Sequence, residues 1–161
     1  MKHYKAHWST SLLAITSLAT VLCLGITLYM VGYFRGWLRW EGFLPLAIIL
    51  VAALFTIRGY SITSDAILVH RLFWRTRLPL AGLESAQVEP EAMRGSIRTF
   101  ANGGLFSFTG FFRNKPLGAY RAFVTDMHQT VVLRFQKRTV VVSPAAPQEF
   151  VHDISIPGHA A

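Results

Sequence analysis

Two long apolar stretches near the N-terminus dominate the hydrophobic pattern of this chain. Residues 12–33 and 43–57 contain no charged side chain, and a short loop, residues 34–42, joins them. At about 1.5 Å per residue, a helix over the first stretch can cross a hydrocarbon core of about 30 Å. The second stretch covers only about 22 Å as a helix. This stretch can cross the membrane if flanking residues lengthen the helix. The alternative is a re-entrant or interfacial segment. The pattern therefore predicts a transmembrane helical hairpin within residues 1–58.

A cleaved signal peptide is the competing interpretation of the N-terminus. Lys2 and Lys5 would form its basic region. However, the apolar run exceeds the usual length of about 7–15 residues in such peptides. No small-x-small cleavage site stands out at its end, and Leu22 directly before Cys23 does not suit a lipoprotein site. We therefore expect a span that is not cleaved.

The cations around the hairpin predict its orientation. The connecting loop holds Arg35 and Arg39, which Glu41 partly offsets. The flanks carry more positive charge, namely Lys2, Lys5, Arg58, Arg71, Arg75 and Arg77. Segments with an excess of Lys and Arg stay in the cytoplasm. We therefore expect a multi-pass protein of the bacterial inner (cytoplasmic) membrane, with both termini and the soluble domain in the cytoplasm.

One face of the first apolar stretch carries small and hydroxylated residues. Thr16, Thr20, Cys23 and Thr27 share this face through steps of three and four residues. Such faces are common contact surfaces between membrane helices. A proton or ion relay normally needs charged groups within the span, and there are none here. We therefore predict helix packing rather than a conduction path.

From residue 59 onward the hydrophobic period changes from that of a helix to that of strands. Pro79 indicates an edge or irregular strand, and Asn102-Gly103 is a strong turn signal. One helical turn is predicted at residues 91–97. Short strands are predicted at residues 59–63, 66–73, 76–80, 83–88, 105–112, 119–125, 130–135 and 139–143.

The alternation within residues 105–112 predicts which side chains face the core. Ser107 and Thr109 fall on the face opposite the phenylalanines at positions 106, 108 and 112. An aromatic core is a better interpretation of this region than a platform for stacking nucleic-acid bases. The side chains expected in that core are Phe100, Phe106, Phe108, Phe111 and Phe112.

The last part of the chain returns to a helical pattern. Pro147 suits the first position of a helix. Phe150, Val151 and Ile154 form one apolar stripe, and Pro157 and Gly158 are expected to end the helix. The predicted fold class is therefore α+β. It has an N-terminal helical hairpin, a β domain over residues 59–156 closed by a helix, and a tail over residues 157–161.

Composition and charge narrow the range of functions. The formal net charge is +8, with 16 Lys and Arg against 8 Asp and Glu. The cations are spread out and interrupted by acidic residues, which argues against nucleic acid and for anionic lipid as the partner. The single cysteine excludes an internal disulfide. No catalytic, cofactor-binding or metal-binding motif is present, so we expect no enzymatic activity.

One cluster stands out as a candidate site at the membrane surface. Arg71, Trp74, Arg75 and Arg77 fall on a predicted hairpin that lies close in sequence to the second apolar stretch. Tryptophan and arginine together suit the headgroup region of a bilayer. The alternative is a solvated hairpin whose cations only follow the positive-inside rule.

The order of the elements resembles a known family. The run YSITSDAILVHRLFWRTRLPLAGLESAQV, residues 60–88, and the junction VVVSPAAPQEFVHDI, residues 140–154, are similar to those of bacterial pleckstrin-homology-like proteins flanked by membrane helices. The resemblance implies a partly open β-barrel of two nearly orthogonal sheets, capped at one end by the C-terminal helix. It also implies a binding or scaffolding role without catalytic residues.

The same resemblance bears on the ligand. In eukaryotic pleckstrin-homology domains, inositol phosphates bind cations in the loop between the first two strands. Here that loop is the short and acidic Ser64-Asp65, which argues against phosphoinositide binding. We expect a non-enzymatic, membrane-anchored module that presents its domain to a protein partner or to the membrane surface. The alternative is an accessory subunit of a larger membrane enzyme or transporter complex.

Overall fold

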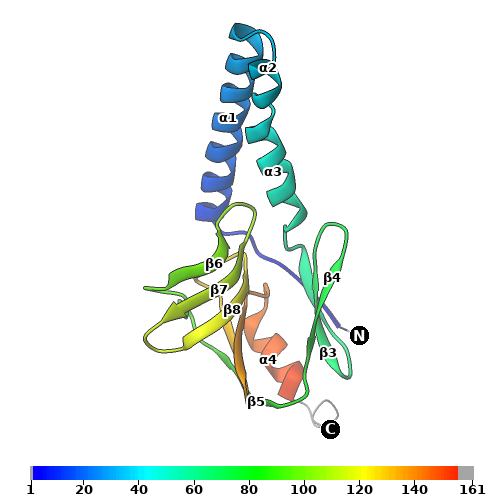
Figure 1. Ribbon diagram of the computed structural model, residues 1–161. Helices are drawn as coiled ribbons and strands as arrows, with labels where there is room; N and C mark the ends of the chain where they lie inside the picture. Colours follow the sequence, from blue (N-terminus) through cyan, green and yellow to red (C-terminus); the bar gives the residue numbers. More distant parts are fainter. Residues whose placement is uncertain (1, 156–161) are drawn as a thin grey trace.

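The computed structural model, which describes residues 2–155, has a helical pair that projects from a β-rich domain (Figure 1). Helix α1 (Thr10–Tyr33) leads away from the domain, and α2 (Leu38–Glu41) and α3 (Leu44–Leu54) return beside it. The domain holds ten strands and the closing helix α4 (Pro147–Ser155). The predicted tail, residues 157–161, and the stop signals Pro157 and Gly158 lie outside the described residues.

The start of α1 is fixed by the domain below it. The Ser9 side chain accepts a hydrogen bond from the Leu12 backbone N–H, as a helix N-cap does. Thr16 and Thr27 are buried, and Thr20 and Cys23 are half-buried, so the hydroxylated face of α1 is the inward one, as predicted. Thr16, however, contacts the loop between two strands of the domain rather than α3.

The predicted second span, residues 43–57, is wrong as a single helix. Gly42 separates α2 from α3, and a Cβ there would lie 2.8 Å from that of Met30 on α1. At its other end α3 stops at Leu54, and Ile57 is fully buried in the core of the domain. An 11-residue helix is about 16 Å long. Among the described helices, α1 is the one long and apolar enough to cross a membrane.

The domain is built from two sheets. The smaller is antiparallel throughout and has the order β1 (Lys2–Lys5), β2 (Gly59–Ile62), β3 (Ala66–His70) and β4 (Arg75–Pro79). The larger has the order β5 (Leu83–Val88), β9 (Val131–Phe135), β10 (Arg138–Val142), β8 (Gly118–Val124), β7 (Phe108–Asn114) and β6 (Ile97–Gly103). Strands β10 and β8 are parallel, and the other neighbours are antiparallel.

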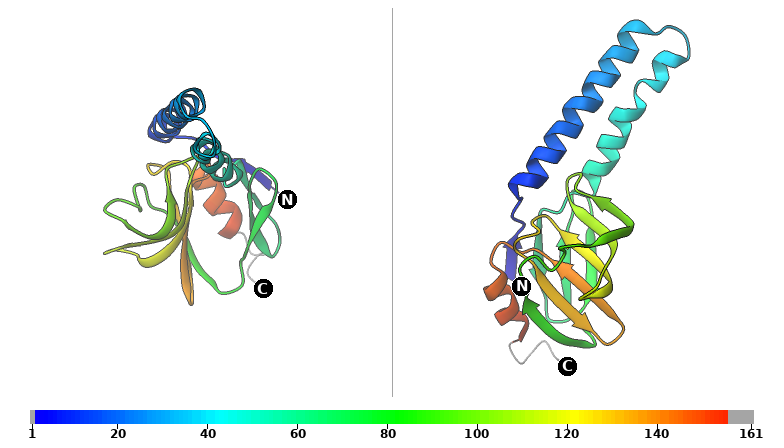
Figure 2. Two further views of the ribbon diagram at one scale, coloured as in Figure 1. Left: turned by 45° about the horizontal axis from the view of Figure 1, so that its top comes forward. Right: turned by 90° about the vertical axis from the view of Figure 1, so that its left-hand side faces the viewer.

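The two sheets do not close into a barrel. Within residues 2–155 no hydrogen-bonded ladder joins them beyond the isolated bridge Ala6↔Pro144, so the predicted partly open barrel is instead two sheets with α4 between them (Figure 2). The predicted edge position of Pro79 is confirmed, because β4 lies at the edge of the smaller sheet. The predicted strands are found with shifted ends. The predicted helical turn at residues 91–97 is wrong, because a non-helical turn there leads into β6.

The main core lies between the sheets. Phe150 and Ile154 on α4 are 0% and 5% exposed and confirm the predicted apolar stripe. Tyr60 on β2 donates a hydrogen bond of 2.7 Å to the carbonyl of Phe123 on β8, which links the two sheets. Burial raises the pKa of Tyr60 to about 12. A second apolar cluster covers the other face of the larger sheet and includes Leu12 at the start of α1.

The aromatic core prediction is correct for some phenylalanines and wrong for others. Phe108 and Phe112 on β7 are buried. Phe100 and Phe111 are instead 84% and 52% exposed. They are register partners across β6 and β7, on the face opposite that of Phe108 and Phe112. The residues before β7 were also misplaced by simple alternation: Ser107 is fully buried in the connecting loop, and Phe106 leaves the extended conformation with a φ of 63°.

Candidate functional site

The predicted arginine cluster does not form one exposed surface, because Arg71 is buried. Only 7% of Arg71 is exposed. Its Nη1 donates to the carbonyl of Phe55 at 2.8 Å, and its Nε donates to Oγ1 of Thr76 at 3.2 Å. Burial and the nearby Arg121 lower the pKa of Arg71. A cation here caps the carboxyl end of α3 and stabilises it, so Arg71 is not part of an exposed cationic surface on the hairpin.

Of the other members of the predicted cluster, Trp74 lies beside Arg71, whereas Arg75 and Arg77 lie apart from it. Trp74 is 39% exposed and packs edge-on against Phe55, with ring centroids 5.3 Å apart. Arg75 and Arg77 are exposed on β4, and Arg77 pairs with Asp65 of the first turn. The structure thus separates the cluster into a packed pair and two solvated cations.

Two apolar loops lie at the end of the domain nearest the helices (Figure 1). The loop between β3 and β4 exposes Leu72 and Phe73, which are 40% and 77% exposed. In the loop between β6 and β7, the Phe106 N–H donates to Oγ1 of Thr16 on α1 at 3.1 Å. The predicted strand over residues 66–73 runs through the first loop, because residues 72 and 73 continue the apolar pattern of β3.

A cavity of about 740 Å³ opens beside the exposed phenylalanines of the larger sheet, and we call it the arginine groove. Five elements contribute: the end of α3, the end of β3, and strands β6, β7 and β8. None of the described residues that line it is acidic. Its main lining side chains are Phe55, Arg71, Arg98, Phe100, Phe111 and Arg121.

Two arginines of the groove, Arg71 and Arg121, lie over aromatic rings and pair with no carboxylate among residues 2–155. The guanidinium of Arg121 lies 4.8 Å from the ring centroid of Phe123 and 5.6 Å from that of Phe111. The guanidinium of Arg71 lies 5.5 Å from the same Phe123 ring. Among residues 2–155, no ion pair involves Arg71, Arg98 or Arg121. The groove therefore holds positive charge that no neighbouring carboxylate neutralises.

The cationic surface continues beyond the groove. A second cavity of about 440 Å³ shares Thr99, Phe111 and Arg121 with it. It adds Lys137 from the turn between β9 and β10 and Arg138 at the start of β10. The described residues that line this cavity also include no acidic side chain. A positively charged strip thus follows one face of the larger sheet. It could not be predicted from the sequence because its residues are far apart in the chain.

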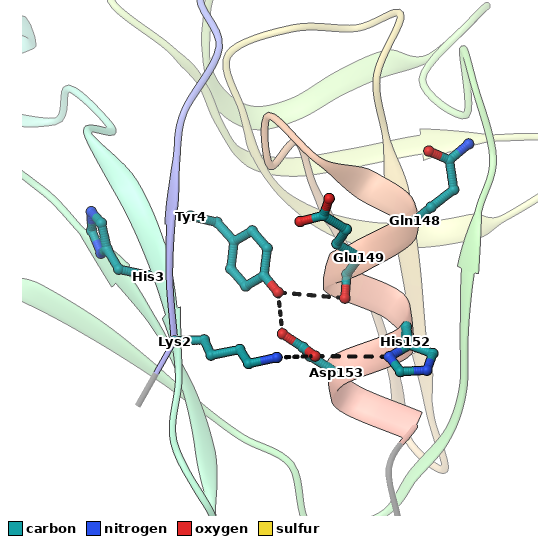
Figure 3. A pocket seen from close by; sticks show the side chains of 7 residues that line it. All are labelled: Lys2, His3, Tyr4, Gln148, Glu149, His152 and Asp153. Atoms are coloured by element: carbon teal, nitrogen blue, oxygen red, sulfur yellow. Dashed lines mark hydrogen bonds and ion pairs between the residues drawn. The ribbon is translucent and has the colours of Figure 1, made fainter.

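A separate polar pocket of about 780 Å³ lies between β1 and α4 (Figure 3). Lys2 Nζ donates to Asp153 Oδ1 at 2.6 Å, and the Tyr4 hydroxyl donates to Oδ2 of the same carboxylate. These hydrogen bonds lower the pKa of Asp153, while burial and Asp153 raise the pKa of Tyr4. Because both carboxylate oxygens accept hydrogen bonds from β1, the pocket serves to join the first strand to the last helix.

Comparison with known proteins agrees with the resemblance seen in the sequence. A family model described as "Bacterial PH domain" matches residues 58–156. The match covers β2 to β10 together with α4, and it leaves out β1 and the helical pair. No curated protein and no solved structure matches the chain.

Proposed function

This chain belongs to the bacterial PH domain family, and we propose that it is a non-enzymatic, membrane-anchored binding module. A PH-like domain suggests a binding or scaffolding role in general. In our proposal the helical pair sits in the bacterial cytoplasmic membrane and holds the domain against the cytoplasmic surface. A protein partner or the membrane surface itself is then the target of the domain.

The exposed apolar surface of the helices is the observation that carries this proposal. Leu18, Val21 and Leu28 of α1 are 72%, 67% and 72% exposed, and Leu44 and Leu50 of α3 are 63% and 60% exposed. Burying one such side chain contributes about 1.5–3 kcal/mol. A helical pair with this surface is therefore stable in lipid and unfavourable in water.

The pairing of β1 with β2 supports a hairpin that enters and leaves on one side of the membrane. Strand β1 precedes α1, and β2 follows α3, yet the two pair from Lys2↔Ile62 to Lys5↔Gly59. If α1 crosses the bilayer, the chain must come back through α2 and α3 to complete this sheet. We therefore propose that α2 and α3, interrupted at Gly42, form a broken second crossing.

The same pairing argues against a cleaved signal peptide. Cleavage after α1 would remove β1 together with the helix. Tyr4 on β1 is only 8% exposed and belongs to the main core, and the Trp8 indole N–H donates to the carbonyl of Ile57 at 3.4 Å. Loss of these residues would open the smaller sheet and the core behind it.

The apolar loops give the domain a surface that suits the membrane interface. Phe73 and Trp74 follow the buried Arg71, and Trp74 packs on Phe55 directly after α3. Aromatic side chains favour the interface between lipid and water. We propose that this loop, rather than the predicted arginines, seats the domain on the bilayer.

An accessory subunit of a larger membrane enzyme or transporter complex is the second candidate function. It is favoured by β6, an edge strand whose Ile97 is 73% exposed. An exposed edge of this kind can accept a strand from a partner protein. Purification in mild detergent distinguishes the two functions, because a stoichiometric membrane enzyme in the eluate would support the accessory role.

Accessibility labelling tests the proposed topology. In a Cys23→Ser background, single cysteines replace Trp37 in the loop between α1 and α2 and Gln87 on β5, both exposed. An impermeant thiol reagent added to intact spheroplasts should label position 37 and not position 87. After the membrane is permeabilised, both should react. Labelling of position 87 in intact spheroplasts would refute the cytoplasmic placement of the domain.

A further inference from the structure

We propose that the arginine groove binds a phosphate-bearing anion that carries an apolar group, with the phosphate held by Arg98, Arg121 and Arg71. The proposal deepens the proposed function, because it names the ligand class of the domain. The groove shares no residue with the Ser64-Asp65 turn, where Asp65 already pairs with Arg77.

The charge of the groove selects an anion. Three arginines line one cavity, and no described lining residue carries a negative charge. Guanidinium groups bind phosphate oxygens through two parallel hydrogen bonds, which makes arginine well suited to this ligand. Within residues 2–155, Arg71 donates hydrogen bonds from Nε and Nη1, and the residue lines the groove.

Two of the three arginines are already held in place before a ligand binds. Arg71 is fixed by the Phe55 carbonyl and the Thr76 hydroxyl, and Arg121 lies over the rings of Phe111 and Phe123. Side chains that are ordered in the free protein lose little conformational entropy on binding. The groove is thus preorganised on two of its three cationic sides.

The exposed phenylalanines indicate that the ligand has an apolar part. Phe100 and Phe111 face each other across β6 and β7 and are 84% and 52% exposed. They line the same cavity as the arginines. A ligand with a phosphate and a neighbouring hydrocarbon group would cover both kinds of surface at once.

The position of the groove points to a lipid headgroup as the source of the phosphate. Phe55, which lines the groove, is the residue directly after α3. Its carbonyl also accepts a 3.2 Å hydrogen bond from Ser107 in the loop between β6 and β7, and that loop contacts α1 through Thr16. The groove therefore lies immediately below the helical pair, where phosphates of a bilayer would be within reach. Free phosphate compounds are the other source of the same chemistry.

Binding to the full chain in a neutral detergent tests the proposal. The probes are short-chain phosphatidylglycerol, short-chain phosphatidylcholine and inorganic phosphate. The groove variant carries Arg98→Gln and Arg121→Gln, and Phe111→Ala removes part of the apolar wall without a change of charge. The matched control carries Arg94→Gln and Arg113→Gln, which remove two exposed arginines outside the groove. Arg71 stays unchanged because it also supports the fold.

The parent and the control should bind phosphatidylglycerol with equal affinity. The groove variant should bind it about tenfold or more weakly. Phe111→Ala should reduce the affinity for phosphatidylglycerol more than the affinity for inorganic phosphate. If inorganic phosphate binds as tightly as the lipid and the groove variant loses it, the phosphate site stands and its source is free phosphate. Equal binding by the groove variant and the parent, or equal binding of phosphatidylcholine and phosphatidylglycerol, would overturn the proposal. This assay needs no membrane, so its failure is distinct from failure of the proposed topology.

Discussion

Replacing Phe150 by alanine measures how much α4 contributes to holding the two sheets together. Phe150 is fully buried, and its ring packs edge-on against Tyr4 of β1 at 5.1 Å and Tyr60 of β2 at 6.2 Å. Truncation of a buried phenylalanine costs about 3–5 kcal/mol, because apolar contacts are lost and a cavity remains. A domain has a free energy of unfolding of only about 5–15 kcal/mol. The substitution should therefore remove a large part of the stability.

Urea unfolding of the full chain in detergent, followed by near-ultraviolet circular dichroism, reports on the packing of these tyrosines. The midpoint should fall strongly for Phe150→Ala, with little change in the slope against urea. Val151→Ala on the same helix is the control, because its half-buried side chain should cost about 1 kcal/mol. If Phe150→Ala costs no more than this control, α4 does not hold the sheets together.

Two further predictions concern the first strand and the groove. Lys2 and Tyr4 lower the pKa of Asp153, so its contribution to stability is present above the unfolded pKa of 3.8 and is lost as pH falls through the lower folded value. Asp153→Asn should reduce stability at neutral pH and flatten the acid limb of the melting temperature against pH. An unchanged acid limb would contradict the role of this carboxylate. At Gly110, φ is 134° and a Cβ would lie 2.5 Å from Cα of Ala101. Gly110→Ala should therefore cost more stability than Gly118→Ala, where φ is 67° but the space is open. Equal melting temperatures of the two variants would contradict this reading.

The elements that were predictable are those whose hydrophobic pattern and burial agree. Strand β5 was predicted with its observed bounds, and the apolar stripe on α4 was predicted from the helical spacing of Phe150, Val151 and Ile154. Strand β1 was missed because its sequence, KHYK, offers only Tyr4 as an apolar residue. It is a strand because it pairs with β2. In the sequence, the whole helical pair lies between these two strands. Strand β6 was missed because it lies at an exposed edge, where burial imposes no alternation.

The candidate site could not be predicted because its chemistry depends on contacts distant in sequence. Arg71 resembles any other cation in the sequence, and only the structure shows that the Phe55 carbonyl accepts its hydrogen bond and that it lies over Phe123. The exposed Phe100 and Phe111 were assigned to the core because large aromatic residues are usually buried. The arginine groove exists only where β3 and the end of α3 approach the face of β6, β7 and β8.

The helical pair and α4 together explain how two sheets without a shared ladder keep their separation. Helix α1 enters the domain through Leu12, which is fully buried in the cluster behind the larger sheet, and Ser9 donates to the carbonyl of Thr125. The chain after α3 enters the smaller sheet instead, through the buried Ile57. Helices α1 and α3 pack on each other. They therefore connect the sheets at the end of the domain opposite to the C-terminal end of α4 (Figure 1). Since Phe55 directly follows α3 and lines the arginine groove, the packing of the helical pair also positions one wall of the proposed ligand site.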